Sequence, residues 1–274
     1  MSLITCALLS TALSANANIG EITVYSATKS EQSIKDVTSN VSVITKEELD
    51  EKNYTTVSQA LQTIVGVSLN SNGGIGQKDS LYIRGVSAQR VLILVDGIRY
   101  NDPTSISGAP LAQLLVNDIE RIEVLKGAQS GIWGSDASGG VVNIITASSK
   151  IGTHGSFLIE KGSFNTQKLA ATLSKVEKKY FLKLNVNKTS SDGISAFEAK
   201  KGSANYGTKS DDLGYEKDGF DNKTFNFAAG YNITNNDTIK VDYKKIEAEY
   251  DYDSSSADAL NNKLELNHYF LFFP

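Results

Sequence analysis

The sequence is poor in the side chains on which most catalytic and metal sites depend. It contains one cysteine and two histidines among 274 residues. The histidines, His154 and His268, lie far apart, and neither a Ser-His-Asp spacing nor a cluster of metal ligands accompanies them. Hydrolase and metalloenzyme functions therefore have little support, and we expect a protein that is not an enzyme.

Long hydrophobic runs are also missing. After the N-terminus no segment approaches the ~18 consecutive apolar residues that a membrane-spanning helix needs. If the chain crosses a membrane, it must therefore do so as a β-barrel, because only helices and closed barrels satisfy their own backbone hydrogen bonds in lipid.

The N-terminal apolar run is short. Leu3 to Leu13 is followed by Ser14-Ala15-Asn16-Ala17. An apolar core that ends in small residues is typical of a signal peptide, and we predict cleavage after Ala17, with a buried helix as the alternative. Cleavage would remove Cys6, so the mature chain would hold no thiol for a disulfide or a nucleophile.

Charge of either sign is scattered rather than concentrated. The 27 Lys and Arg residues and 31 Asp and Glu residues give a net charge of -4, and they form no basic stripe. Nucleic acid is therefore not expected as a partner.

Residues 31–148 alternate strand and helix signals, which indicates a compact α/β unit. Thr45-Lys46-Glu47-Glu48 and Thr56-Val57-Ser58-Gln59 are capping-box sequences and predict two helix starts. Asp96-Gly97 predicts a tight turn between two strands. Strands are expected at 41–44, 67–69, 81–84, 91–95, 98–100, 119–126 and 141–145, and helices at 57–64 and 111–116.

From about residue 155 the pattern changes to period-two alternation. Within 182–187, leucine and valine occupy the even positions, and lysine and asparagine occupy the odd ones. The connections at 176–179 and 232–236 are tight, whereas 190–221 is long and polar. Short turns at one end and long loops at the other are typical of outer-membrane barrels, although a soluble β-sandwich or a lipocalin-like barrel shows the same alternation.

Four sequence blocks resemble the plug domain of TonB-dependent outer-membrane receptors. They are residues 81–85 (LYIRG), 91–97 (VLILVDG), 119–127 (IERIEVLKG) and 134–146 (GSDASGGVVNIIT), and they occur in the order that the family shows. The chain departs from the family pattern at Lys126-Gly127-Ala128, where Arg-Gly-Pro is usual, and at Trp133, where tyrosine is usual. The resemblance implies an α+β plug domain followed by antiparallel transmembrane β-barrel strands, in an incomplete barrel of about six strands.

The resemblance also implies a domain order and a function. Residues 1–17 would be the signal peptide, 18–30 the TonB box and linker, 31–148 the plug and 149–274 the partial barrel. Receptors of this family take up a scarce ligand actively: the ligand binds at the outer face, and TonB, energised by the inner membrane, pulls on the plug. The expected partners are TonB, a small-molecule ligand and the outer membrane, and no cofactor is required.

The TonB contacts are expected just behind the predicted cleavage site, at Glu21, Ile22, Thr23, Val24 and Tyr25. An extended and loosely held segment can add as a strand to the edge of a TonB sheet, with main-chain hydrogen bonds supplying the affinity. An ordinary N-terminal strand is the alternative.

Residues 72–80 and 180–196 are similar to the cobalamin receptors of this family, which makes cobalamin the expected ligand. A ferric siderophore or haem is the alternative. By the same likeness, the ligand would touch the plug apex at Gly74, Gln77, Asp79, Ser80, Tyr100, Asn101, Ser105 and Ser107.

Two sets of charged residues are given roles by the resemblance. One set would face the polar lumen of the barrel and hold the plug through ion pairs and water, unless these are simply solvated charges: Arg84, Glu120, Arg121 and Glu123. Cobalamin receptors also bind calcium in an early external loop. Oxygen ligands of the kind that hard cations need are present here, with a solvated acidic loop as the alternative, at Glu216, Asp218, Asp251 and Asp253.

About six strands do not close a barrel, and open strand edges are not tolerated in lipid. We therefore expect a truncated form that does not transport alone unless a second chain completes the barrel. An alternative of another class is a surface binding module that a colicin, a phage or an adhesin contacts without transport.

Overall fold

The structure is a computed structural model of the chain. It describes residues 23–28, 30, 32–37, 39–102, 105, 107–146, 151–194, 217–234, 237–253 and 258–272, with the backbone alone from residue 252 onward. The predicted signal peptide, Glu21 and Ile22 lie outside the described residues. Within the described part, no helix combines the length and the apolar character needed to cross a membrane.

The first half folds around a five-stranded mixed sheet, in the order β3-β8-β9-β6-β7. Its strands are β3 (Val41–Thr45), β6 (Val91–Val95), β7 (Ile98–Arg99), β8 (Arg121–Lys126) and β9 (Gly140–Ile145). Two small hairpin sheets accompany it, formed by β1 (Thr23–Val24) with β2 (Gln32–Ser33) and by β4 (Val67–Ser71) with β5 (Asp79–Ile83). The helical segments are η1 (Ile34–Asp36), α1 (Lys46–Glu51), α2 (Val57–Leu61), η2 (Ala88–Arg90), η3 (Leu111–Gln113), α3 (Ser130–Trp133) and η4 (Ser135–Ala137).

Both predicted helix starts are confirmed, with one difference in detail. At α2 the capping box is complete, because Thr56 Oγ1 accepts the Gln59 amide at 3.4 Å and Gln59 Oε1 accepts the Thr56 amide at 3.3 Å. At α1 only the threonine cap forms, since Glu48 instead accepts a hydrogen bond from Lys52 Nζ at 2.6 Å. Each cap satisfies amides that a helix start leaves unpaired.

Two predicted helices are shorter than expected. The helix predicted at 57–64 ends at Leu61. The one predicted at 111–116 is only the three-residue turn η3, because the residues that follow turn extended: Leu114 accepts the Val57 amide at 2.9 Å, and Leu115 forms a bridge with Thr56. Pairing with a neighbouring segment therefore overrides the local helix preference.

The predicted turn at Asp96-Gly97 is confirmed. Both residues have positive φ, +51° and +82°, and Val95 pairs with Ile98 across the turn. Positive φ at both central positions is the geometry that two-residue hairpins favour, and Asp-Gly adopts it at low strain.

The five-stranded sheet is buried on both faces. One face carries Ile44, Ile93 and Ile122 and packs against α2 and the 111–119 segment. The other face carries Leu92, Leu94, Leu125 and Val141 and is covered by Val24, Ala27, Trp133 and Ala137. Residues just behind the predicted cleavage site therefore complete the core of the plug.

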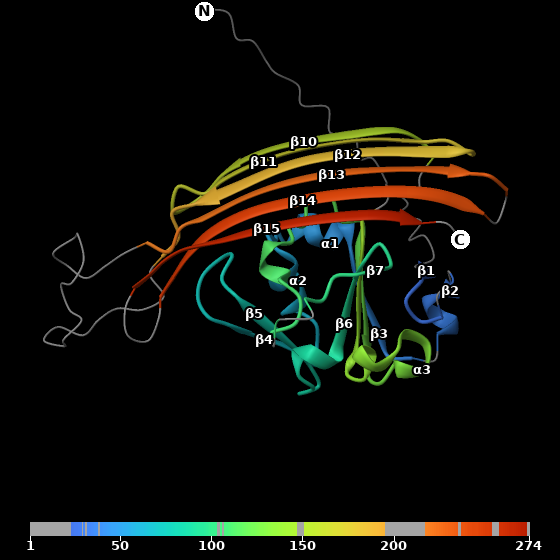
Figure 1. The fold of residues 1–274 in the computed structure, drawn as a ribbon, viewed down its shortest axis with the longest axis horizontal. Helices are drawn as coiled ribbons and strands as arrows, with labels where there is room; N and C mark the ends of the chain where they lie inside the picture. The colour runs from blue at the N-terminus through green and yellow to red at the C-terminus, as the bar shows by residue number, and fades with distance from the viewer. Residues whose placement is uncertain are drawn as a thin grey trace, which may run out of the picture.

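The second half forms a single antiparallel meander, a six-stranded sheet in the described part of the chain. Its strands are β10 (Gly152–Lys161), β11 (Gln167–Val176), β12 (Tyr180–Ser191), β13 (Phe220–Asn232), β14 (Thr238–Asp253) and β15 (Asp258–Phe272). Figure 1 shows that this sheet curves over the plug, and we call it the wall. β1 and β2 lie towards the end of the wall with tight turns, whereas β4 and β5 lie towards the end with long loops (Figure 1).

The wall reverses the usual distribution of polar and apolar side chains. On β12 the outward Leu182 is 46% exposed, whereas the inward Asn185 is fully buried against the plug. The same alternation continues on β13 and β14, as the sequence predicts. A soluble sandwich would bury its apolar face, so this arrangement favours the membrane barrel over that alternative.

At Gly140 the backbones of two neighbouring strands of the plug sheet leave no room for a side chain. Its φ is +150°, and an added Cβ would lie 2.5 Å from the Leu125 carbonyl oxygen. We expect Gly140→Ala to lower the free energy of unfolding by about 2 kcal/mol or more, because it combines backbone strain with a backbone clash. Urea unfolding of the full chain in detergent, followed by the fluorescence of the one tryptophan, Trp133, measures the effect.

Gly131→Ala is the matched control, because nothing lies within 4 Å of its added Cβ. We expect a change within about 0.5 kcal/mol. Equal unfolding midpoints for the two variants would show that the close approach at Gly140 is unimportant.

Candidate functional site

A hollow of about 230 Å³ lies where the plug apex meets β14, and we call it the apical hollow. Three of the predicted ligand residues line it: Asp79, Ser105 and Ser107. Lys78, Asp102 and Gly108 also line it and lie within the two stretches, 74–80 and 100–108, that the sequence predicts at the plug apex. Sequence reasoning missed the other lining residues, which are Ala109, Pro110, Gln113 and Tyr250. Tyr250 belongs to the wall, and no local sequence signal indicates that it approaches the plug.

Asp79 gives the apical hollow a carboxyl group that is less acidic than usual. Burial raises the pKa of Asp79, and hydrogen bonds with Ser58 and Ser71 oppose the rise without cancelling it. A buried carboxyl of this kind gains a proton more readily than an exposed one. Beside Lys78 and the two serines, it equips the hollow to donate and accept hydrogen bonds to a polar ligand.

Two predicted ligand residues have structural roles instead. Tyr100 is buried in the plug core, where burial raises the pKa of its phenol. Asn101 extends the sheet, because its Oδ1 accepts the Ile93 amide at 2.7 Å and its Nδ2 donates to the Val91 carbonyl at 2.9 Å. Gly74 and Ser80 are also absent from the lining that the described residues define. Contact between the predicted residues and a ligand stays a prediction.

The loop before β5 is fastened to the wall. Gly76 packs on the Phe220 ring so closely that a Cβ would lie 2.1 Å from it. Gln113 Nε2 donates to the Gly76 carbonyl at 2.6 Å, and Asn222 Nδ2 donates to the Gln113 carbonyl at 3.0 Å. Gln77, another predicted ligand residue, donates to the Asp251 carbonyl at 2.6 Å. These contacts hold the apical hollow in a fixed shape.

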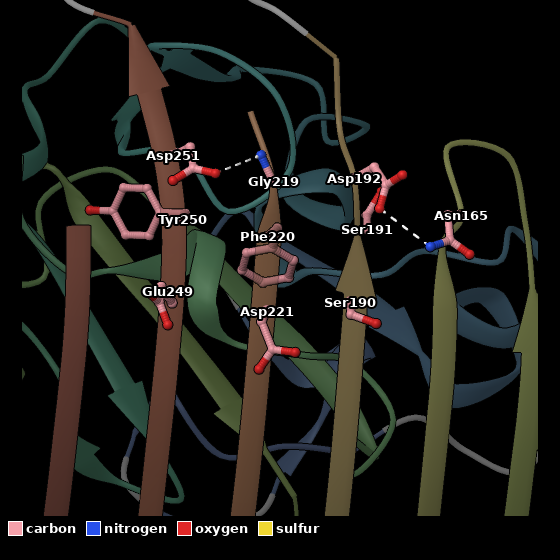
Figure 2. Close-up of a pocket in the computed structure, with 10 residues that line it drawn as sticks. All are labelled: Asn165, Ser190, Ser191, Asp192, Gly219, Phe220, Asp221, Glu249, Tyr250 and Asp251. Carbon is pink, nitrogen blue, oxygen red and sulfur yellow. Dashed lines mark hydrogen bonds between the residues drawn. The ribbon is translucent and has the colours of Figure 1, made fainter. Parts of the chain in front are cut away.

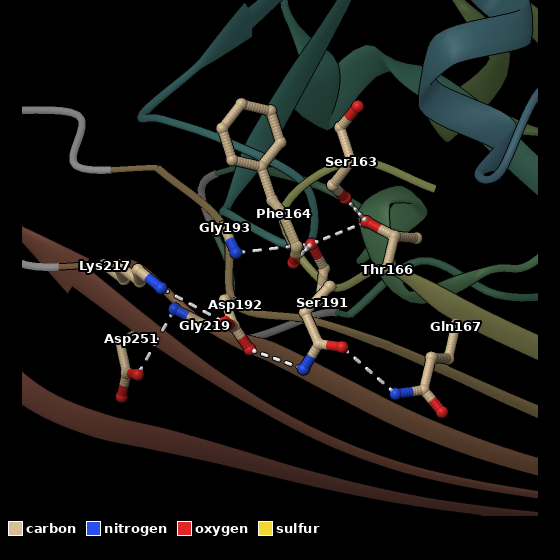
Figure 3. Close-up of polar contacts among 11 residues, drawn as sticks. Ser163, Phe164, Thr166, Gln167, Ser191, Asp192, Gly193, Lys217, Gly219 and Asp251 are labelled. Carbon is tan, nitrogen blue, oxygen red and sulfur yellow. Dashed lines mark hydrogen bonds and ion pairs between the residues drawn. The ribbon is translucent and has the colours of Figure 1, made fainter. Parts of the chain in front are cut away.

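A second hollow, of about 310 Å³, lies at the long-loop ends of β12, β13 and β14 (Figure 2). Its lining carries four carboxylates, from Asp192, Asp221, Glu249 and Asp251. Two hydrogen bonds hold its edge. Asp192 accepts one from Lys217 Nζ at 3.2 Å (Figure 3) and one from Asn165 Nδ2 at 3.3 Å (Figure 2). These bonds lower the pKa of Asp192.

The predicted calcium ligands fall partly outside the described residues, since Glu216 and the side chain of Asp253 are not described. Asp218 is buried, and Asp251 Oδ2 accepts the Gly219 amide at 3.3 Å. Among the residues that are described, no three acidic, histidine or cysteine side chains gather to hold a metal ion. The described carboxylates alone therefore do not form a calcium site.

Below the apical hollow, the plug and the wall meet at a buried ion pair. Asp118 Oδ2 lies 3.6 Å from Lys244 Nζ and accepts a hydrogen bond from Asn226 Nδ2 at 3.2 Å. Lys183 Nζ donates to the Asp118 carbonyl at 3.0 Å and also to the Thr146 carbonyl. Burial favours the neutral carboxyl, but Lys244, Lys183 and Asn226 outweigh it and lower the pKa of Asp118.

This cluster replaces the charges that the sequence assigned to the plug–barrel contact. Arg84 and Glu120 form no ion pair with the wall in the part of the chain that is described. Arg121 Nε instead donates to Glu123 Oε1 at 2.9 Å inside the plug. Glu123 cannot face the barrel because it points to the sheet face that the N-terminal segment covers.

Glu123 and Trp133 bind Tyr25 and Ser26 in the N-terminal segment, residues 23–28, and we call this set of contacts the latch. Its fully buried carboxylate accepts the Tyr25 amide at 3.0 Å, the Ser26 amide at 2.9 Å and the Ser26 hydroxyl at 2.5 Å. Trp133 Nε1 donates to the Ser26 carbonyl at 2.7 Å. Hydrogen bonds to a charged acceptor are about twice as strong as neutral ones, so the N-terminal segment is held at Tyr25 and Ser26.

The comparisons with known proteins agree with this architecture. Residues 33–141 match the family model of the TonB-dependent Receptor Plug Domain. Over 123 residues the chain is 43% identical to the vitamin B12 transporter BtuB of Vibrio vulnificus (strain YJ016), covering 45% of this chain and 20% of that protein. The chain thus spans about a fifth of the length of this curated relative.

Solved structures extend the likeness beyond the plug. The siderophore receptor PirA of Acinetobacter baumannii matches with a TM-score of 0.59 and 26% identity, over 77% of this chain and 32% of that chain. The copper transporter OprC matches with a TM-score of 0.63 and 19% identity, over 82% and 32%. The fold prediction is confirmed: a plug domain with a mixed sheet precedes an antiparallel sheet that forms part of a barrel. The matched family contains transporters rather than enzymes, in agreement with the sequence.

Asp118 makes plug docking depend on pH. Because its pKa is lowered, ionised Asp118 stabilises the folded state above the ordinary value of about 4, and this contribution is lost as pH falls through the lowered pKa. We expect Asp118→Asn to lower the free energy of unfolding at neutral pH by about 3 kcal/mol, because it removes the ion-pair partner of the buried Lys244 ammonium group. The difference from the parent chain should narrow below about pH 4, as urea unfolding monitored by Trp133 would show.

Asp50→Asn is the control, since Asp50 forms an exposed ion pair with Lys46 on α1. It should change stability by no more than about 0.5 kcal/mol. A difference between parent and Asp118→Asn that stays constant with pH would contradict the assignment.

The latch predicts how often the N-terminal segment opens. With Cys6→Ser as background and Val24→Cys as the probe, we expect Glu123→Gln to raise the rate of maleimide labelling about tenfold or more, because the amide replaces a charged acceptor. Mass spectrometry of the full chain over time measures the rate. Glu120→Gln, three positions earlier, removes the same charge outside the latch and should leave the rate unchanged; equal rates for both variants would rule the latch out.

Proposed function

We propose that this chain provides the plug and the first wall strands of an outer-membrane receptor for active uptake of a scarce ligand, because residues 33–141 match the model of the TonB-dependent Receptor Plug Domain. The observation that carries the proposal is the placement of two features at opposite ends of the plug. The apical hollow is lined by Lys78, by Asp79 of β5 and by Tyr250 of β14. Figure 1 shows β5 towards the end of the wall with long loops, and β1, which precedes the latched Tyr25 and Ser26, towards the end with tight turns.

TonB is the partner that we propose for the N-terminal segment. Thr23 and Val24 already form a short strand, and their neighbour Tyr25 donates its amide to the latch. A segment in this extended conformation needs no refolding to add to the edge of another sheet. Residues 21–25 are thus proposed as the TonB-binding segment, with release from Glu123 as the step that precedes binding.

Cobalamin is the ligand that we propose for the apical hollow. The support is the 43% identity of the matched region to a vitamin B12 transporter and the polar lining around Asp79. A ferric siderophore is the second candidate, because a siderophore receptor is among the structural matches. Haem has no such support. A surface module contacted without transport remains the alternative of another class.

Ligand titration of the full chain in detergent tests the choice of ligand. We expect cyanocobalamin to give binding heat by calorimetry and a ferric catecholate to give none. Ser107→Tyr should weaken binding about tenfold or more, because the ring occupies part of the apical hollow. Ser135→Tyr adds the same ring at an exposed position in η4 and should leave the affinity unchanged.

Each outcome separates the candidates. Binding of the ferric chelate alone would replace cobalamin with a siderophore. Binding of neither compound would favour the surface module. Equal weakening by both tyrosine variants would place the ligand away from the apical hollow.

A further inference from the structure

A third hollow lies on the outer side of the wall, facing away from the plug. It measures about 280 Å³ and is formed by β10, β11 and β12 near their long-loop ends. Its lining residues on the outer face are Ile159, Lys161, Gln167, Leu169, Lys188 and Ser190. We call it the outer hollow. Glu160 and Lys168 also line it, from the inner face of their strands, and they pair with each other at 2.9 Å between Lys168 Nζ and Glu160 Oε1. Lys168 therefore offsets the charge of the one carboxylate in the lining.

The strand register arranges this lining in two rows. In the lower row, Ile159 pairs with Leu169, which pairs with Lys188. In the upper row, Lys161 pairs with Gln167, which pairs with Ser190. Directly opposed residues of antiparallel strands share a face, so two apolar side chains and two lysines surround one depression.

Three lysines, Lys161, Lys188 and Lys223, lie on this part of the outer face. Lys188 is directly opposite Lys223, and like charges in that position repel each other. Both lysines share one carboxylate, that of Asp221, at 3.9 and 3.6 Å. Other outward acidic residues, Glu247 and Glu249, belong to β14 on the far side of β13. Lys161, in contrast, has no ion-pair partner among the described residues, so the side formed by β10 to β12 is suited to an anion.

The outer hollow also lies at the upper border of an exposed apolar band. Ile159 is 66% exposed and Leu169 is 47% exposed, and Phe157 and Val186 continue the band below them. A free phosphate ion would use the lysines but leave this apolar surface uncovered. A ligand with an anionic head and a hydrocarbon tail satisfies both parts.

We propose that the outer hollow binds a phosphorylated lipid. The phosphate lies between Lys161 and Lys188, and an acyl chain covers Ile159 and Leu169. The orientation of the wall in a membrane rests on the proposed function, but the site itself does not depend on which nutrient is carried. Such a lipid would anchor the wall at the headgroup level of the leaflet next to the long loops.

Native mass spectrometry of the full chain in a non-ionic detergent tests the proposal. Phosphatidic acid and phosphatidylcholine with the same acyl chains are added separately, and the lipid that remains bound is counted. We expect retention of phosphatidic acid in clear preference to phosphatidylcholine. The double variant Lys161→Gln/Lys188→Gln should lose affinity for phosphatidic acid by about 25-fold, at about fivefold for each lysine near an anionic headgroup.

Lys175→Gln/Lys178→Gln is the matched control. It removes the same charge from the tight-turn end of the wall, outside the outer hollow, and should retain phosphatidic acid as the parent chain does. Unfolding midpoints by Trp133 fluorescence confirm that both double variants are folded. Because the assay contains no nutrient and no TonB, a failure of the transport proposal does not affect it.

Three results of the lipid-retention measurements would overturn the proposal. They are undiminished retention of phosphatidic acid by Lys161→Gln/Lys188→Gln, equal losses in both double variants, and equal retention of the two lipids by the parent chain. Displacement of the lipid by inorganic phosphate alone would also overturn it, because the site would then recognise a free anion rather than a lipid.

Discussion

The arrangement of this molecule depends on a buried polar contact between the plug and the wall, centred on Asp118. Removing one partner from a buried ion pair costs about 3–5 kcal/mol, yet the intact pair adds little over an apolar contact of the same size. The contacts among Asp118, Lys183 and Lys244 therefore fix the position of the plug but add little to the free energy that holds the plug and the wall together. An apolar contact does occur higher on the wall, where Ile246 and Ala248 join the plug core. The interface is thus specific in the position it gives the plug and only moderately strong.

One stretch of chain connects the three functional regions. Gln113 at the apical hollow, Asp118 at the wall and Glu123 in the latch lie at five-residue intervals along the segment from η3 to β8. β8 occupies the interior of the plug sheet, paired on both sides by β3 and β9. A strand with two neighbours and buried faces moves as a body rather than residue by residue. A shift at the apical hollow would therefore reach the latch through the sheet, without a separate relay of side chains.

Local signals predicted the plug well where a residue acts through its own neighbours. Thr56 with Gln59 and the Asp96-Gly97 turn are such cases, since caps and hairpins are decided within four residues. The period-two pattern likewise predicted the wall. The sequence did not indicate contacts beyond the nearest neighbours. Asn101 binds backbone groups of β6, 8 and 10 positions earlier, and Glu123 binds Ser26, 97 positions away. The lining of the apical hollow was only partly foreseen for the same reason, because Tyr250 reaches it from the wall.

The proposed TonB-binding segment is extended, but it is also docked on the plug. The free energy of opening decides how often it is available to a partner. Fully burying Val24 contributes about 1.5–3 kcal/mol, and hydrogen bonds to the charged Glu123 contribute about 1.5–3 kcal/mol each at most. An opening free energy of about 4 kcal/mol leaves roughly one molecule in a thousand open, which lowers the apparent affinity of any partner by the same factor. The latch therefore acts as a threshold. Weakening the hydrogen bonds of Glu123 by about 1.4 kcal/mol would raise the open population tenfold.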